Sequence, residues 1–178
     1  MNAADLRELH EQRTRTLKRH PSLGKSSVHA SVKLVSTLAC EARHGGRVTR
    51  VDLSHEEGGS ETGPTPGDLM RASLGACMAM SYRQWGARLG VDIRSVEVEV
   101  TCEFDARGQL GLSDDVPAGW ERLLLEVRIV TTASAADVRR VVEIADRLSP
   151  MLGNLSPAIA RAHALTISRL ETTTTTTL

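Results

Sequence analysis

The sequence has few aromatic residues and no excess of charge of either sign. Its 178 residues include two tryptophans, one tyrosine and one phenylalanine, too few for the aromatic platform on which single-stranded nucleic acids stack. The 22 basic residues balance 22 acidic ones, which argues against binding to nucleic acid or to a membrane surface through net charge. We therefore expect neither nucleic acid nor membrane as a partner.

Long apolar runs are also missing. No stretch reaches the roughly 18 residues of a membrane span, and the charged residues 1–20 contain no signal-peptide core. Cysteine is sparse, and Cys40, Cys77 and Cys102 follow neither a disulfide framework nor a metal-ligand spacing. The histidines, His163 among them, have no zinc-like spacing and are expected at the surface or in turns. We expect a cytoplasmic protein with reduced cysteines, no metal and no other cofactor.

The apolar patterning that is present predicts an α+β domain preceded by a helical arm. Strand patterns follow one another without a helix between each pair, which favours antiparallel pairing over a doubly wound parallel sheet. The expected division is an N-terminal helical arm over 1–24, a domain over 25–171 and a Thr-rich tail over 172–178. Within it we expect helices over 3–19, 65–89 and 135–148, and strands over 28–40, 47–53, 95–104, 121–131 and 162–170.

The strongest helix signal lies between residues 63 and 89. Thr65 can cap the helix, Pro66 suits its first position, and Asp68 completes a capping box. Apolar residues then go nearly all round the helix, which predicts burial in a core or at an interface. Gly90 marks its end. Cys77 lies in the middle of this helix, so its thiol is either a packing residue or a reactive group.

The three cysteines differ in this respect. Cys40 and Cys102 fall on the inward faces of alternating strands, where packing explains them. Cys77 lies roughly 15 Å from the start of its helix at 1.5 Å per residue, beyond the first turn in which the helix dipole acts. A reactive thiolate at Cys77 therefore requires a nearby cation or hydrogen-bond donors.

Gly63-Pro64-Thr65-Pro66, Leu69 and Leu74-Gly75-Ala76-Cys77 together resemble the OsmC/Ohr family. The order of the later strands and helix agrees, so the resemblance covers about residues 28–170. It implies an OsmC-like fold, with antiparallel sheets around a long buried central helix, and an intertwined homodimer. It also implies reduction of small apolar organic hydroperoxides by Cys77, with an external thiol as the reductant.

The sequence departs from the family pattern at three places. Ser149 stands before Pro150 where the family carries its second, resolving cysteine. Gly67 stands where peroxidase members carry a glutamate, although Asp68 is adjacent. The family's arginine has no clear counterpart, and Arg43, Arg47 and Arg50 are the candidates. We assign Cys77 as the nucleophile, with Asp68 and Arg47 as the groups that orient it.

Two functions remain open at this point. The first is a thiol peroxidase that works through Cys77 without a resolving cysteine. The second is a non-catalytic dimer of the same fold that binds an apolar small molecule. The retained thiol favours the first function, and the serine at position 149 favours the second.

Overall fold

The computed structural model describes residues 2–155 and 158–170; the Thr-rich tail predicted over 172–178 lies outside them. By its internal contacts the chain divides into two compact units. The larger unit combines the first twelve residues with the chain from Leu74 onward, and the smaller unit spans Arg13–Ser73. Helix α1 (Ala3–Arg19) and helix α2 (Pro66–Leu89) each contribute to both units. Each unit is described separately.

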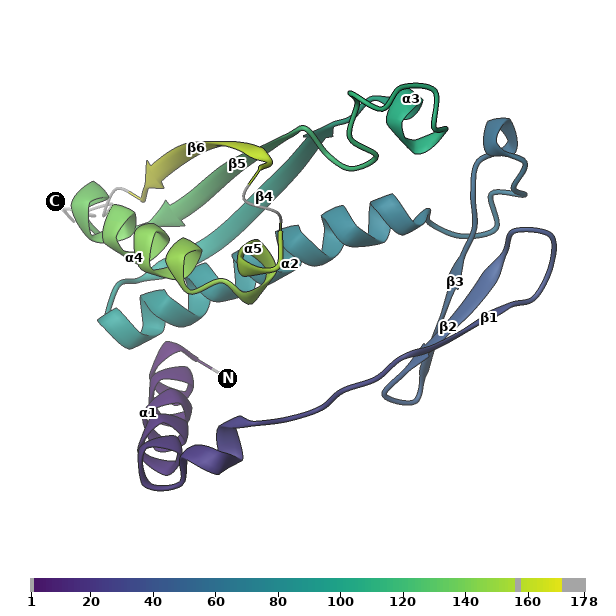
Figure 1. Cartoon of the computed structure of the whole chain (residues 1–178). Coiled ribbons are helices and arrows are strands. Elements are labelled where there is room, and N and C mark those ends of the chain that lie inside the picture. Colours follow the sequence, from purple (N-terminus) through teal and green to yellow (C-terminus); the bar gives the residue numbers. More distant parts are fainter. Residues whose placement is uncertain (1, 156–157, 171–178) are drawn as a thin grey trace, which may run out of the picture. The chain divides into compact units, whose positions relative to one another are not determined.

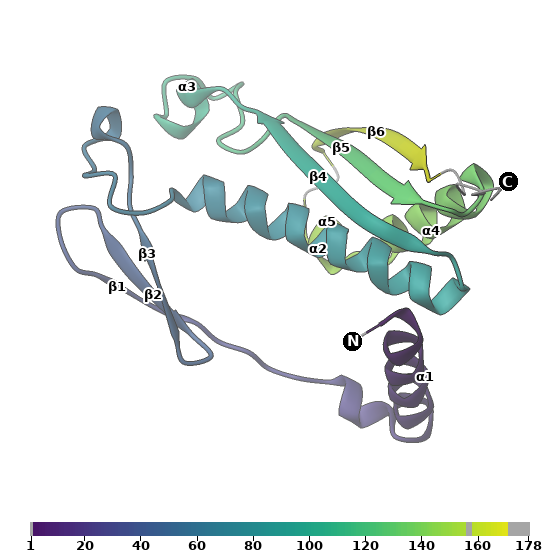
Figure 2. The same cartoon turned by 180° about the vertical axis from the view of Figure 1, so that it is seen from behind.

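The larger unit is built on a three-stranded sheet of β4 (Ile93–Glu103), β5 (Arg122–Thr131) and β6 (Ala160–Arg169), in that order (Figures 1 and 2). Helices α3 (Ala106–Gln109), α4 (Ala135–Arg147) and α5 (Pro150–Gly153) join its strands. Helices α2 and α4 lie along the same face of the sheet (Figure 1). The α+β class predicted from the sequence is confirmed.

One strand pair departs from the expected antiparallel pairing. Strands β4 and β5 are antiparallel, with Cys102 opposite Leu123, but β5 and β6 are parallel. The physical reason is the connection: α4 and α5 carry the chain back along the sheet before β6 begins, and such a crossover joins parallel strands.

The core of the larger unit lies between this sheet and its two helices. Strand β5 contributes every second residue, as the alternation in the sequence predicts. The fully buried side chains at the centre are Leu74, Met78 and Tyr82 from α2, Leu123, Val127 and Ile129 from β5, and Val138 and Ala145 from α4. One stripe of α2 is thus covered by the sheet within a single chain.

The smaller unit carries an antiparallel sheet of β1 (Ser31–Leu34), β2 (Cys40–His44) and β3 (Arg47–Val51), preceded by the short helix η1 (Pro21–Gly24). The turn between β2 and β3 consists of Gly45 and Gly46, with φ of 52° and 76°, a backbone region that favours glycine in two-residue hairpin loops. The predicted turn at these glycines is therefore confirmed.

The loop after β3 is held by a single buried carboxylate. Asp52 is 2% exposed and accepts hydrogen bonds from the hydroxyl of Thr62 at 2.6 Å and from its backbone N–H at 3.1 Å. These bonds, with others from Leu53 and Ser60, lower the pKa of Asp52 to about 2. The acidic loop that includes η2 (His55–Glu57) is thus tied back to the end of β3.

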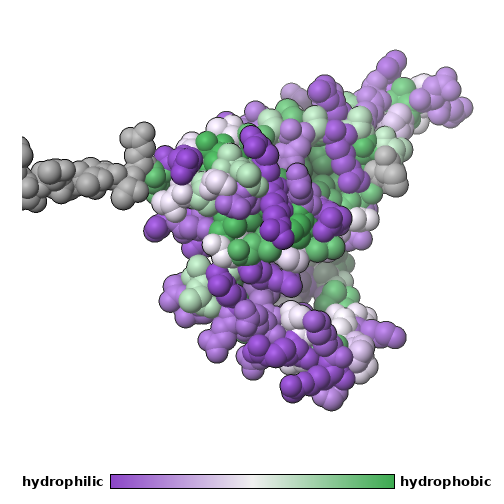
Figure 3. Space-filling model, turned by 90° about the vertical axis from the view of Figure 1, so that its left-hand side faces the viewer, coloured by the Kyte–Doolittle hydropathy of each residue, from purple (hydrophilic) through white to green (hydrophobic). Residues whose placement is uncertain are grey.

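Two apolar residues at the ends of predicted elements, the strand over 95–104 and the helix over 135–148, are exposed. Phe104 is 57% exposed because β4 ends one residue earlier, and Leu148 is 55% exposed because it caps α4 instead of continuing its buried stripe. On the face drawn in Figure 3, hydrophobic residues lie among hydrophilic ones, which is usual for folded proteins. Within the described ranges, no helix is both long enough and apolar enough to span a bilayer.

Candidate functional site

The helix that carries Cys77 begins with the predicted capping box. The backbone N–H and the hydroxyl of Thr65 donate to Asp68 Oδ2 at 2.9 and 2.8 Å, and the Asp68 N–H donates to Thr65 Oγ1 at 3.1 Å. The bonds from Thr65, with the neighbouring Arg71, lower the pKa of Asp68. The described contacts of this carboxylate are thus made with Thr65 before the helix and with Arg71 in its second turn.

A close approach of α2 to β4 fixes the position of the thiol. A Cβ atom on Gly75 would lie 3.2 Å from Val100 Cγ2 and 3.7 Å from the carbonyl oxygen of Val98, so the glycine lets the helix backbone rest directly on the strand. Leu74 and Met78, on either side, are fully buried. Cys77 follows two residues later at the edge of this contact and is partly exposed.

Ser149 is the residue that the structure brings to the sulfur. Its Oγ lies 4.0 Å from Cys77 Sγ, at hydrogen-bond distance for sulfur. The serine is 4% exposed and caps α5, where its Oγ accepts from the Leu152 N–H at 3.2 Å. That oxygen accepts from the backbone through one of its two lone pairs, so its proton can be donated to the sulfur, and a neutral thiol can donate to its second lone pair. A hydrogen-bond donor at this position stabilises a thiolate.

The other predicted site residues belong to the smaller unit. Arg47 is exposed on β3, and no hydrogen bond or ion pair of its side chain is found in the described chain. Arg43 pairs with Glu41 at 2.9 Å, and Arg50 donates to Thr62 at 2.8 Å. The assignment of Asp68 and Arg47 to the site therefore stays a prediction.

The remaining cysteines fit a packing role. Cys40 and Cys102 are partly buried, and Cys102 packs against the core of the larger unit. No group of three or more potential metal ligands occurs among the residues described.

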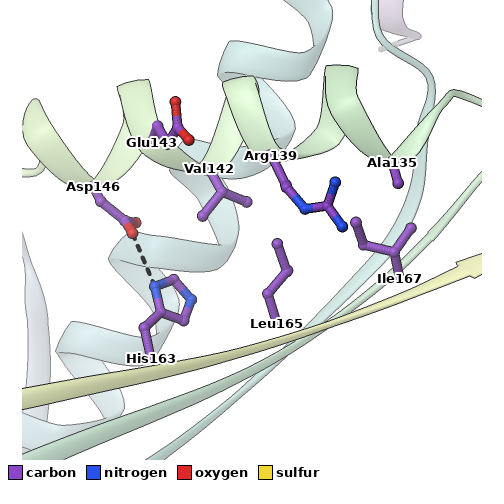
Figure 4. A pocket seen from close by; sticks show the side chains of 8 residues that line it. All are labelled: Ala135, Arg139, Val142, Glu143, Asp146, His163, Leu165 and Ile167. Atoms are coloured by element: carbon purple, nitrogen blue, oxygen red, sulfur yellow. Dashed lines mark ion pairs between the residues drawn. The ribbon is translucent and has the colours of Figure 1, made fainter.

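A second polar cluster was missed by the sequence analysis. The hydroxyl of Tyr82 donates to Asp146 Oδ1 at 2.8 Å, and Asp146 Oδ2 lies 3.0 Å from His163 Nδ1 (Figure 4). Burial, together with Asp146, raises the pKa of the Tyr82 hydroxyl, so it stays a donor. His163 thus belongs to this cluster, and its position on β6 is exposed, as the surface placement predicted from the sequence has it. In the sequence, only the alternation of His163 with Leu165 and Ile167 along β6 indicates that these three side chains share a face of the strand.

By its fold and its site, the chain is an α+β protein with a partly exposed thiol on its central helix, and this thiol faces a serine that caps another helix. A family profile described as OsmC-like protein matches residues 58–162. Because this match covers more than half of the chain, the protein belongs to the OsmC-like family, as a divergent member. The resemblance inferred from the sequence is confirmed.

Solved structures agree on the fold. The chain is similar to an OsmC-like protein from Mycoplasma pneumoniae, with 13% identity and a TM-score of 0.68 over 83% of this chain and 99% of that one. It is also similar to an organic hydroperoxide resistance protein from Elizabethkingia anophelis, with 12% identity and a TM-score of 0.63 over 81% and 99%. A third relative, an organic hydroperoxide resistance protein OsmC from Legionella pneumophila, has 15% identity and a TM-score of 0.61 over 80% and 99%. No match was found among curated protein sequences.

Proposed function

We propose that the protein is a thiol peroxidase of the OsmC/Ohr type that reduces organic hydroperoxides through Cys77. The observation that carries the proposal is the hydroxyl of Ser149 at 4.0 Å from Cys77 Sγ. It supplies a donor to a sulfur that is only partly buried, in a family whose structural relatives include proteins titled as organic hydroperoxide resistance proteins.

The reaction proceeds by two-electron oxidation of the sulfur. The Cys77 thiolate attacks one peroxide oxygen, an S–O bond forms, the O–O bond breaks, and the alkoxide leaves as an alcohol after it takes a proton. The sulfur becomes a sulfenic acid. Ser149 cannot form a disulfide, so an external thiol attacks the sulfenic sulfur and releases water. A second thiol then reduces the mixed disulfide and restores Cys77.

Three further parts of the proposal rest on the family resemblance. Asp68 and Arg47 orient the thiolate, with Arg43 and Arg50 as the alternative arginines. Two copies of the chain form a homodimer, which is supported by the exposed side of α2, where Met80 is 59% exposed. The protein acts in the cytoplasm, where thiol reductants are present.

Oxidation with cumene or t-butyl hydroperoxide tests the proposal. The reduced protein should gain the mass of one oxygen atom at Cys77, and the Cys77→Ser variant should gain none at that position. Cys40→Ser and Cys102→Ser are the matched controls and should react like the wild type. If Cys77 stays reduced while a small free thiol in the same tube is oxidised, the peroxidase proposal is wrong.

A second candidate function is binding of an apolar small molecule by a non-catalytic dimer. The residue at position 149 favours it, because a buried serine in the place of a resolving cysteine cannot complete the usual disulfide cycle. Hydroperoxide turnover with a dithiol donor separates the two candidates. Turnover that is abolished by Cys77→Ser would exclude the non-catalytic function.

A further inference from the structure

A cavity of about 550 Å³ lies between α4 and β6 in the larger unit (Figure 4). Its size is within the roughly 300–1,000 Å³ of small-molecule pockets. Neither Cys77 nor Ser149 lines it. The lining residues are Ala135, Arg139, Val142, Glu143, Asp146, His163, Leu165 and Ile167. The cavity is therefore separate from the site proposed for peroxide reduction.

Asp146 and His163 form a hydrogen-bonded polar end of the cavity. Both carboxylate oxygens of Asp146 are occupied, one by the Tyr82 hydroxyl at 2.8 Å and the other by His163 Nδ1 at 3.0 Å. An ionised carboxylate only accepts hydrogen bonds, so Nδ1 carries its proton and donates. The other ring nitrogen, Nε2, lies on the side of Leu165 in Figure 4. It remains available to a ligand, and it donates when the imidazole is protonated.

The arginine of the lining is the group that can attract an anion. In Figure 4 the guanidinium of Arg139 extends from α4 toward β6, whereas the carboxylate of Glu143 is directed away from β6. Across the described part of the chain, the side chain of Arg139 makes no hydrogen bond or ion pair. Asp146 is already engaged by two donors. Beside His163 Nε2, the Arg139 guanidinium is thus the group directed into the cavity without a partner, and it is a cation with a planar set of donors.

We propose that this cavity binds a small aliphatic carboxylate. The Arg139 guanidinium holds the carboxylate through two parallel hydrogen bonds, the geometry for which this side chain is suited. His163 Nε2 donates the second hydrogen bond when the imidazole is protonated. The aliphatic part of the ligand packs on Val142, Leu165 and Ile167, which supply the apolar lining. Tyr82 and Asp146 act as positioning residues, because Asp146 uses both of its carboxylate oxygens to hold Tyr82 and the imidazole.

Octanoate is the probe for the test, in an NMR titration of the full chain with labelled methyl groups. The methyl signals of Val142, Leu165 and Ile167 should shift and saturate. Arg139→Gln should weaken binding by about tenfold or more, since hydrogen bonds to charged groups contribute that much. Arg140→Gln is the matched control, because Arg140 is the neighbouring arginine on α4, is exposed like Arg139, and does not line the cavity. It should bind octanoate like the wild type.

Two further measurements test whether the cavity recognises the carboxylate and whether it acts apart from the thiol. Octanol has the same chain without the charge, and it should bind much more weakly than octanoate. The Cys77→Ser variant should bind octanoate unchanged, so the outcome does not depend on the peroxidase proposal. The inference is wrong if octanoate gives no saturable shift at these methyl groups, if Arg139→Gln binds as tightly as the wild type, or if octanol binds as tightly as octanoate.

Discussion

At the scale of single residues, the chemistry of the site depends on the atom that faces Cys77 Sγ. Ser149 presents a hydroxyl at 4.0 Å, in a buried position fixed by its capping bond to Leu152. The hydroxyl can donate to a thiolate but cannot form a bond to sulfur. A cysteine has nearly the same shape, so position 149 decides whether oxidation of Cys77 ends in a sulfenic acid or in a disulfide.

Ser149→Cys should convert the protein to a two-cysteine peroxidase. After reaction with t-butyl hydroperoxide, we expect a disulfide between residues 77 and 149 in place of the added oxygen atom, since the two side chains already meet. Intact mass under non-reducing conditions measures the difference. The variant should be less stable by about 0.5–2 kcal/mol, because it loses the serine cap of α5.

Ser149→Ala is the matched control for this substitution. It removes the cap and the donor in the same way but cannot form a disulfide, so its oxidised form should keep the added oxygen. If Ser149→Cys also keeps the added oxygen, the close approach of residues 77 and 149 does not hold in solution.

The sequence predicts those site residues that are marked by a motif of neighbouring residues. The capping box of Thr65 and Asp68 and the glycine before Cys77 lie within one helix, and Ser149 was found through its proline neighbour. The cluster of Tyr82, Asp146 and His163 was not found, because its bonds join residues as far as 64 positions apart. Such a cluster depends on how α2, α4 and β6 pack, which no local pattern encodes.

At the scale of elements, glycines set how closely α2 packs on the strand that follows it. A Cβ atom on Gly86 would lie 2.6 Å from Ile93 Cγ1 and 3.1 Å from the carbonyl oxygen of Val91. Gly86 also accepts a hydrogen bond from the Val91 N–H at 2.9 Å, which turns the chain from α2 toward β4. A side chain at this position would push the helix end away from the sheet.

Gly86→Ala should therefore destabilise the protein by about 1–3 kcal/mol, the usual cost of overpacking. This effect is opposite to the gain that alanine normally brings to a helix. Gly153→Ala is the matched control, since nothing lies within 4 Å of a Cβ at that helical glycine. Urea unfolding measures both variants. Equal stability of the Gly86→Ala variant and the wild type would contradict the close packing described for α2.

Some helices and strands are predicted well from the sequence, and others are not. Helix α2 begins and ends where Thr65 and Gly90 predict, and the buried residues of β5 follow the predicted alternation. The parallel pairing of β6 with β5 was not predicted, because alternation defines a strand's faces but not its neighbour. The sequence does not predict the four-residue helix α3, since a single turn leaves no periodic pattern.

At the scale of the whole molecule, the larger unit leaves apolar surface beside its core. The stripe of α2 that contains Leu74, Met78 and Tyr82 is buried, whereas Ala76 and Met80 on another side of the helix are exposed. The sequence is apolar on both of these sides of the helix. A helix that is apolar all round and covered on one side requires a second surface, and the proposed homodimer supplies it.

Met80→Glu should shift the protein from dimer to monomer. A carboxylate buried at an interface between two copies, with no partner, costs far more than the lost methionine contact. Sedimentation equilibrium measures the mass, which should fall from that of two chains to that of one. Leu112→Glu is the matched control, because Leu112 is 70% exposed in the loop after α3 and should leave the dimer intact. A wild type with the mass of one chain, or a Met80→Glu variant with the mass of two, would show that this side of α2 is not the interface.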